Sequence, residues 1–428
     1  MSWEATHEAI EESVKIISRL KGRRLIPQSG QLALDPYLLE EASGYTITPL
    51  EEPFGVKEIA KISDNMMKIG LDSYCQSVGC HFATQFITTA AVCTHSIYPI
   101  ADYPEGPWEY PISISQPYKW IGVLPSTDAQ IPMPSNPHIK IFDSEYDRKQ
   151  AQTELGQGLE THIICNVLPA VTDFARDIGA DPFVVLDGCI YFLPSQKLFE
   201  RAFKYRKWED YAEFYKSDIY ARVDVINSFY LKREIPIVGI VKRTGHSHLL
   251  ISSKGYPRHE QIRELAERLN VNPRAFSNDE SFIFELFQRA LSLGRISTPC
   301  IGVMTSALQV DYSTLKPFGR KFRELGKVLH QNPKVYIYVG LFPHPLLRDY
   351  FEIFRIETTK RIYDKFGDSL WIEAISDAIC RSCTLPSSII YADKRCRDWS
   401  SILFKYSGEM FINHGLYLDY DTRARLME

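Results

Sequence analysis

The chain has 428 residues, of which 45% are hydrophobic and 24% are charged; this is the composition of a globular protein and excludes general disorder. The formal net charge of −4 excludes a uniformly basic nucleic-acid coat protein, but it is compatible with a local basic path beside an acidic metal site. No run approaches the roughly 18 consecutive apolar residues that cross a bilayer. Because the charged, amphipathic residues 1–24 lack the apolar core of a signal peptide, we expect a cytoplasmic protein without membrane contact.

The first 65 residues are expected to form a helical arm. Residues 2–24 place apolar side chains at helical spacing, and a second helix is expected over Val56–Met67. The period then changes to that of strands, which predicts a hairpin built from residues 68–75 and 86–94.

The next part of the chain mixes irregular, helical and extended patterns. Residues 99–139 carry many prolines and aromatic residues and are expected to form an irregular insertion. A helix is expected over residues 147–178, with a bend at Pro169. A buried strand pair that turns at an Asp-Gly dipeptide is expected over residues 182–193.

A second, helical insertion is expected over residues 196–233, which are dense in charged and aromatic side chains, and an apolar strand follows at residues 235–242. Further helices and strands are expected at 258–270, 279–292, 300–305, 335–341, 350–357, 359–382 and 392–413. The succession predicts an α/β domain over residues 66–428, with a central mixed sheet flanked by helices and carrying the two insertions.

Two aspartates end apolar runs that should be buried, namely Asp72 in Ile-Gly-Leu-Asp and Asp187 in Val-Val-Leu-Asp-Gly. A buried carboxylate has a large desolvation cost unless it is paired, hydrogen-bonded or bound to a cation. Both residues are therefore candidate metal ligands. The alternative is that each caps a turn, because aspartate and glycine are frequent turn residues.

A helical carboxylate is the third candidate. Glu160 falls on the same helical stripe as Ile163, Val167 and Val171, which would direct it toward the strand carboxylates. The alternative is a first-turn glutamate that the helix dipole favours. Glu154, on the same segment, is the fallback.

Carboxylates drawn from different strands and a helix are what a pair of hard divalent ions requires, because Mg²⁺ and similar ions prefer oxygen ligands. Two ions about 4 Å apart stabilise both the attacking and the leaving oxygen of a phosphoryl displacement. The three carboxylates thus point to hydrolysis of a phosphodiester.

The order of motifs over roughly residues 60–428 resembles that of the NurA nuclease family, whose fold is RNase H-like. The motifs that carry the resemblance are VVLDG and PIVGIVKR in this order, preceded by the strand aspartate and the helical glutamate, and followed by NDESFIFELF, GRIS, FRIE, LPSSIIYADKRCR and GLYLDYDTRARL. By this resemblance Asp72, Glu160 and Asp187 are expected to be catalytic and to bind two Mn²⁺ or Mg²⁺ ions.

The resemblance also marks three further residues. Lys242 is expected to contact a phosphate as a point charge; a solvated lysine that leaves a strand is the alternative. Asp279 is a further expected metal ligand, for which a helix N-cap is the alternative. Asp393 is another, and it stands where the family usually has histidine, so the metal preference and pH profile are expected to differ. The family's first aspartate is commonly followed by Gly-Ser, whereas Ser73 and Tyr74 follow here.

The family resemblance implies a DNA nuclease with single-strand endonuclease and 5′–3′ exonuclease activity in DNA end processing and repair. It implies a homodimer that works with a HerA-type hexameric ATPase, and the chain itself has no P-loop sequence. Cations beside aromatic residues and at a strand end are expected to contact DNA, with solvated helical faces as the alternative: Arg201, Lys204, Arg206, Lys207, Lys242 and Arg243.

Two other functions compete with the nuclease. The departures at Ser73 and Asp393 are also compatible with a NurA-like binding or scaffolding subunit of an ATPase complex whose catalysis is weakened. A different RNase H-like enzyme, such as a guided nuclease of Argonaute type, would need guide-binding segments that the sequence does not display. The nine scattered cysteines are expected to be free thiols, with a zinc or redox site at Cys380 and Cys383 as the alternative.

Overall fold

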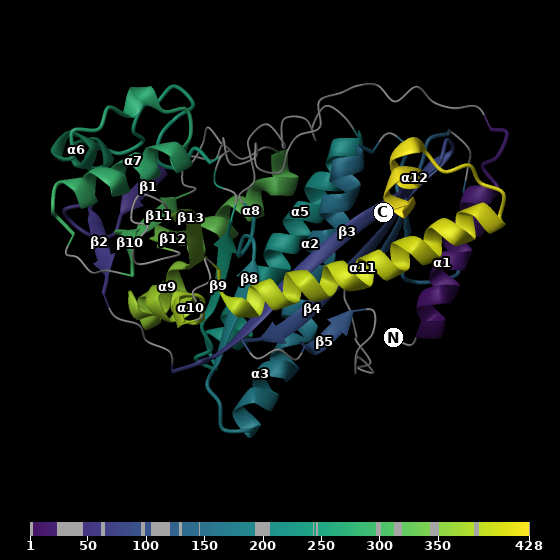
Figure 1. Ribbon diagram of the computed structural model, residues 1–428, viewed down its shortest axis with the longest axis horizontal. Coiled ribbons are helices and arrows are strands. Elements are labelled where there is room, and N and C mark those ends of the chain that lie inside the picture. Colours follow the sequence, from purple (N-terminus) through teal and green to yellow (C-terminus); the bar gives the residue numbers. More distant parts are fainter. Residues whose placement is uncertain are drawn as a thin grey trace. The chain divides into compact units, whose positions relative to one another are not determined.

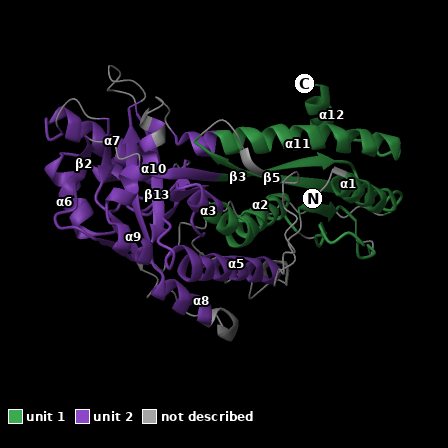
Figure 2. Ribbon diagram, turned by 90° about the horizontal axis from the view of Figure 1, so that it is seen from below, with its two compact units in different colours: residues 1–34, 71–173, 391–428 green, residues 35–70, 174–390 purple. Residues whose placement is uncertain are grey.

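The computed structural model describes residues 3–23, 46–60, 65–95, 99–103, 120–127, 131–144, 146–192, 206–242, 244, 247–296, 301–311, 319–342, 351–380 and 385–427. Its helices and strands are labelled in Figure 1. The chain divides into two compact units, coloured separately in Figure 2. Unit 1 comprises residues 1–34, 71–173 and 391–428, and unit 2 comprises residues 35–70 and 174–390.

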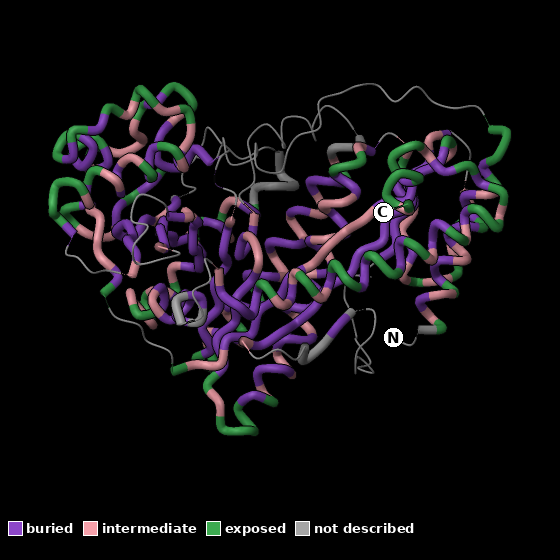
Figure 3. Tube along the Cα trace, in the orientation of Figure 1, coloured by how far each residue is buried: buried purple, intermediate pink, exposed green. Residues whose placement is uncertain are grey.

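Unit 1 is built on strands in the order β3-β4-β6-β7, and β5 also pairs with β4. The β4–β6 pair is antiparallel and the β6–β7 pair is parallel, so the sheet is mixed. Strand β4 is buried at every residue (Figure 3), because helices cover both of its faces. The strands are β3 (Met67–Gly79, within unit 1 from residue 71), β4 (Ala83–Thr94), β5 (Pro99–Tyr103), β6 (Ile121–Pro125) and β7 (Ile139–Ile141).

Helix α2 lies on one side of the unit 1 strands and helix α11 on the other (Figure 2). The alternation of side chains along β4 agrees with this, because Phe86 lies on the α2 side, whereas Thr89 donates a hydrogen bond to the backbone oxygen of Cys396 on α11. Gln85 of β4 links α11 to helix α1 through hydrogen bonds with Ser407 and Ser13. The helices are α1 (Trp3–Ser18), α2 (Arg148–Asn166), α3 (Leu168–Asp177), α11 (Ser387–Asn413) and α12 (Tyr420–Met427).

Unit 2 holds the strand order β1-β11-β12-β13-β9-β8, and β10 pairs with both β12 and β2. The β12–β13 and β13–β9 pairs are antiparallel, whereas β8 and β9 run parallel. Strand β12 is buried along its whole length. The strands are β1 (Thr46–Pro49), β2 (Val56–Ile59), β8 (Pro182–Asp187), β9 (Ile237–Val241), β10 (Gly302–Thr305), β11 (Leu308–Asp311), β12 (Lys334–Leu341) and β13 (Glu352–Thr359).

Helices cover the unit 2 sheet. Helix α7 packs on β12, β13 and β2, and helix α9 packs on β12 and β13. The helices are α5 (Arg206–Val225, continued by a π-helical turn at Ile226–Tyr230), α6 (Glu260–Arg268), a short 3₁₀ turn (Pro273–Ala275), α7 (Asp279–Ser292), α8 (Gly319–Gln331), α9 (Lys360–Phe366) and α10 (Ser369–Cys380).

The α/β class, with mixed sheets flanked by helices, is confirmed. The hairpin of β3 and β4, the break in the helix next to Pro169 and the long C-terminal helix also agree with the sequence predictions. The helix predicted over Val56–Met67 is wrong, because β2 occupies its first four residues and β3 begins at its end. The second strand of the pair predicted after Asp187 is also absent from the described residues 188–192. The predicted domain limits, 1–65 and 66–428, stay a prediction.

None of the helices in the described ranges is both long enough and apolar enough to cross a membrane.

Candidate metal centre

Strand β3 places Asp72 inside unit 1. The residue is only 6% exposed, and its Oδ1 accepts a hydrogen bond of 2.7 Å from the backbone N–H of Ser73. Its Oδ2 lies 3.9 Å from the Sγ of Cys396 on α11. The aspartate therefore directs one oxygen along its own strand and the other toward the helix that covers it.

Helix α11 supplies two further ligand-type side chains, one helical turn apart. Asp393 and Cys396 bring a carboxylate oxygen and the sulfur to Asp72, so that the three ligand atoms all lie within 4.8 Å of one another. Cys396 is fully buried, and Asp393 is half-buried. The cluster thus joins a strand and a helix that lie more than three hundred residues apart in the sequence.

The donor set fits a divalent cation. Metal–oxygen and metal–sulfur bonds of about 2.0–2.3 Å allow two ligands of one ion to be separated by up to roughly 4.5 Å, which matches the spread of these three atoms. Two carboxylates suit Mn²⁺ and Mg²⁺, whereas the thiol favours softer ions.

Arg397 brings a positive charge next to this cluster. Its Nε donates to Asp393 Oδ1 at 2.7 Å, and its guanidinium stacks on the ring of Tyr74 with 4.5 Å between their centres. The hydrogen bond to Asp393 raises the pKa of Arg397 above its ordinary value, so this arginine stays charged. A cation at the cluster would have to share Asp393 with Arg397.

The predicted helical ligand, Glu160, lies on the other face of the strand. Its Oε1 accepts a hydrogen bond of 2.7 Å from Ser73 Oγ, and neighbouring residues of a strand point to opposite faces. Glu154 is buried, forms an ion pair with Lys140 and accepts a hydrogen bond from Tyr146. Within the described ranges, the ligand group around Asp72 includes neither glutamate, and metal binding by Glu160 stays a prediction.

Asp187 and Lys242 come together in unit 2. Asp187 is the last residue of β8, and the parallel neighbour β9 leads directly to Lys242, whose Nζ donates to Asp187 Oδ2 at 2.5 Å. The following Gly188 has φ of 119°, a conformation that favours glycine. The structure thus pairs two residues that the motifs had marked separately. Asp187 and Asp72 belong to different units, and their convergence on shared ions stays a prediction.

Asp279 is held by hydrogen bonds in the structure, and metal binding by this residue stays a prediction. The residue begins α7, but the N-cap is Asn278. The carboxylate is fully buried, and it accepts hydrogen bonds from Tyr338 and Ser247 and from three successive backbone N–H groups, those of residues 249–251. Five donors use the accepting capacity of the two oxygens, about four lone-pair sites, so we assign this side chain to holding the loop.

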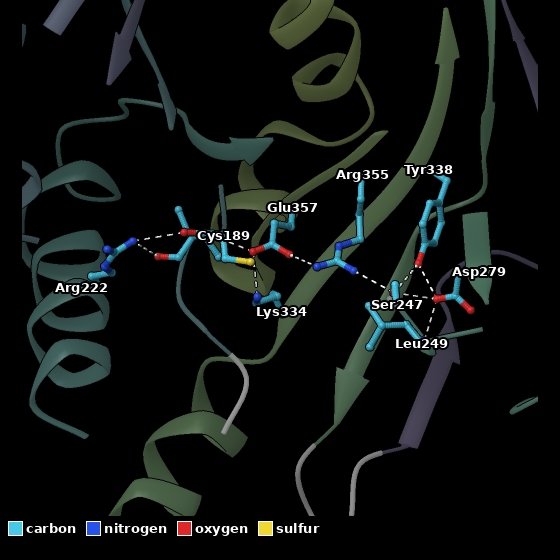
Figure 4. Close-up of polar contacts among 10 residues, drawn as sticks. Cys189, Arg222, Ser247, Leu249, Asp279, Lys334, Tyr338, Arg355 and Glu357 are labelled. Carbon is cyan, nitrogen blue, oxygen red and sulfur yellow. Dashed lines mark hydrogen bonds and ion pairs between the residues drawn. The ribbon is translucent and has the colours of Figure 1, made fainter. Parts of the chain in front are cut away.

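The hydrogen bonds of Asp279 continue into a buried ionic network (Figure 4). Arg355 donates to Ser247 and pairs with Glu357, which also pairs with Lys334. The four charged groups, two cationic and two anionic, have no exposed surface. Glu357 pairs with both cations, and Asp279 is held by hydrogen bonds from neutral donors, so each buried charge has partners, as it requires. Burial, together with the charge of Asp279, raises the pKa of Tyr338 well above its ordinary value, which keeps its hydroxyl protonated as a donor.

The network also fixes the turn that follows Asp187. Glu357 accepts a hydrogen bond of 2.8 Å from the backbone N–H of Ile190, and Arg222 donates to the backbone oxygen of Cys189 at 3.1 Å (Figure 4). These contacts come from β13 and α5, far from β8 in the sequence. The position of Asp187 is therefore supported by buried charges of unit 2.

Most of the predicted DNA contacts cannot be placed. Arg201, Lys204 and Arg243 lie outside the described residues, and Arg206 and Lys207 are described only as backbone in the first turn of α5.

Sequence reasoning missed Cys396. A signal was present, because Cys396 follows Asp393 by three residues, a spacing that puts two side chains on one face of a helix. Burial raises the pKa of the neighbouring thiol Cys93 to about 12, so that thiol stays protonated, and it is not part of the ligand group.

No family model and no curated protein matches the chain. Among solved structures, the chain is similar to the NurA nuclease from Sulfolobus solfataricus, at 11% identity over 84% of this chain and 88% of that one, with a TM-score of 0.41. It is also similar to a structure described as NurA with manganese, at 7% identity over 82% of this chain and 91% of that one, with a TM-score of 0.35.

Proposed function

We propose that this chain is a divalent-metal-dependent deoxyribonuclease that hydrolyses phosphodiester bonds in single-stranded DNA and at DNA ends. The observation that carries the proposal is the meeting of Asp72, Asp393 and Cys396, because the motif order independently marks both aspartates as ligands. Carboxylate oxygens are the ligands that the divalent ions of hydrolytic metal centres prefer.

The residues have separable roles in the proposed reaction. When bound there, a divalent ion would supply a water of lowered pKa and would offset charge on the leaving oxygen. Asp72 and Asp393 would hold that ion, and Cys396 would be the third ligand. The roles of Asp187 as a further ligand and of Lys242 as a phosphate contact rest on the motif order and on their mutual ion pair.

The test is cleavage of an end-labelled single strand in Mn²⁺ or Mg²⁺, followed on a denaturing gel. Asp72→Asn is expected to lower the rate by about a hundred-fold or more, because it removes a charged ligand. Asp398→Asn, which changes an exposed aspartate of the same helix, is the matched control and should leave the rate unchanged. Full activity of both Asp72→Asn and Asp187→Asn would remove the proposed site.

A non-catalytic role is the second candidate. Asp393 and Asp187 each already pair with a cation, Arg397 and Lys242 respectively, which favours a scaffolding subunit that binds DNA without cutting it. DNA binding with no cleavage in either Mn²⁺ or Mg²⁺ would support this role and exclude the nuclease.

The family resemblance extends the proposal to assembly. We propose a homodimer that works with a HerA-type hexameric ATPase, with endonucleolytic and 5′–3′ exonucleolytic cutting. Sedimentation of the purified chain tests the dimer, and co-elution with a HerA-type ATPase tests the complex. Strands labelled at either end distinguish the two cleavage modes.

A further inference from the structure

A second polar site lies in unit 2, in a pocket of about 580 Å³ between the turn that precedes α6 and the 3₁₀ turn that follows it. This volume is within the range of about 300–1,000 Å³ that is usual for small-molecule sites. The lining holds three arginines, one exposed aromatic ring and one acidic residue, among ten residues in all: Gly255, Tyr256, Pro257, Arg258, His259, Glu260, Arg263, Asn272, Pro273 and Arg274.

The exposed aromatic ring and one of the arginines form a platform on which a planar ligand could stack. Tyr256 is 52% exposed, and the guanidinium of Arg274 lies 5.2 Å from its ring centre, the geometry of a cation–π contact. Arg274 is exposed and has no ion-pair partner among the described residues. The platform therefore combines a stacking surface with a positive charge that no acidic side chain of the described residues pairs with.

The backbone fixes this platform. Gly255 has φ of 74°, and a Cβ at this position would lie 2.5 Å from the backbone oxygen of Pro273 and 2.6 Å from Cα of Arg274. Only glycine permits this close approach. The turn that carries Tyr256 and the turn that carries Arg274 are thus in close backbone contact, and the side chains of these two residues lie next to each other.

Asp279 holds the chain segment that leads into the same turn. Its carboxylate binds the backbone N–H groups of residues 249–251, and the chain then pairs Ile251 with Pro257 across the turn that carries Tyr256. The segment that Asp279 holds is therefore bridged to Pro257, a residue of the pocket lining.

The remaining lining adds positive potential. The pocket includes the N-terminus of α6, where the helix dipole is positive; the His259 side chain already accepts the backbone N–H of Gln261, and Glu260 lies in the first turn. Arg263 is shared with Glu260 and Glu267, so Arg274 is the cation of this lining that we assign to a ligand's negative charge.

We propose that this pocket binds one nucleotide unit of a single DNA strand, with the base stacked on Tyr256 and its phosphate facing Arg274 and the N-terminus of α6. Aromatic stacking beside cations is how single strands are bound without sequence preference. The inference rests on the proposed function for its ligand, but the pocket itself is independent of the metal centre. It gives the nuclease a second contact with its strand.

The test measures binding in EDTA, so that cleavage plays no part. Fluorescence anisotropy of a labelled oligothymidylate is expected to show about ten-fold weaker binding for Tyr256→Ala and for Arg274→Ala, since a stacked base contributes about 1–3 kcal/mol. Tyr256→Phe should bind like the original protein because it keeps the ring. Tyr417→Ala, which removes a tyrosine that is 78% exposed in unit 1, is the matched control.

Other outcomes would overturn the inference. Weaker binding of Arg274→Ala with no loss for Tyr256→Ala would indicate a plain anion or acidic-peptide site. Tighter binding of free thymidine monophosphate than of the oligonucleotide would indicate a free nucleotide as the ligand. A bromodeoxyuridine-substituted strand should cross-link to Tyr256 on irradiation, and cross-linking elsewhere alone would also contradict the proposal. If the original protein bound the oligonucleotide but did not cleave it in Mn²⁺, the result would contradict the nuclease proposal and would leave the pocket proposal intact.

Discussion

The Sγ of Cys396 lies 3.9 Å from Oδ2 of Asp72 and donates to the backbone oxygen of Asp393 at 3.2 Å. A fully buried thiol thus lies within 4.8 Å of a carboxylate oxygen of each aspartate in the candidate metal centre. A sulfur ligand changes which ions a site prefers, because thiolates bind soft and borderline cations more strongly than they bind Mg²⁺.

We therefore expect Cys396→Ser to weaken Cd²⁺ and Co²⁺ binding by about ten- to a hundred-fold, an effect of the size seen when metal-site residues are replaced, while Mg²⁺ binding changes little. The measurement is the near-ultraviolet sulfur-to-metal absorption of the Cd²⁺ or Co²⁺ protein. Cys93→Ser changes a thiol of the same small apolar cluster and should keep the absorption. An unchanged absorption in Cys396→Ser would show that the sulfur is not a ligand.

Arg397→Ala is expected to strengthen Mn²⁺ binding, because the guanidinium competes with a metal ion for Asp393. The gain should be about two- to five-fold, since an exposed ion pair contributes little free energy. Calorimetric titration with Mn²⁺ measures it. Arg289→Ala breaks a pair of the same helical spacing with Glu285 and is the control. Weaker Mn²⁺ binding in Arg397→Ala would mean that the arginine supports the site.

Asp279→Asn is expected to lower the free energy of unfolding by about 3 kcal/mol or more, because it removes one anion from a buried, balanced network. Denaturant unfolding measures the change. Glu285→Gln, on the more exposed side of the same helix, should have little effect. If Asp279 were instead a metal ligand, Asp279→Asn would leave the stability of the metal-free protein intact.

The stability of unit 1 is expected to fall as the pH drops from about 6.5 to about 4. Burial, assisted by the charge of His138, lowers the pKa of His162 from 6.5 to about 4. Between these values the unfolded chain binds a proton that the folded chain does not, so stability rises with pH through this window and is constant above it.

The loss at low pH should be on the order of 3 kcal/mol for this histidine. Unfolding in denaturant across the window measures it, and His162→Asn should flatten that part of the profile. His81→Asn, which replaces an exposed histidine of the same unit, should leave the slope as it was. If the pH dependence of the stability persisted in His162→Asn, it would have to come from other titrating groups.

The sequence alone predicted the structure where one hydrophobic pattern matched the burial of an element. Strand β4 reads as a β-branched apolar run and is buried on both faces. Asp72 and Asp393, which the motif order marks, do lie close together, but metal binding by them stays a prediction. Strand β2 was not predictable in this way. Its residues fit a helical pattern, but pairing with β10 decides their conformation, and pairing partners more than two hundred residues away leave no local signal.

The contacts of two predicted ligands also depend on residues far away in the sequence. Asp279 looked like a ligand or a cap because its neighbours in sequence suggest a helix start, whereas its five donors come from residues 247–251 and from β12. Glu160 was placed on the correct helix, but which face of β3 that helix covers depends on the packing of both α2 and α11.

Strand β4 exposes no residue to solvent, and this has a consequence for how the protein opens. Amide protons in such a strand exchange with deuterium only when the surrounding unit unfolds, since no smaller fluctuation reaches them. The slowest exchanging peptides of unit 1 should therefore come from residues 83–94. Their exchange rate then reports the opening free energy of that unit alone, even while the rest of the chain is still folded.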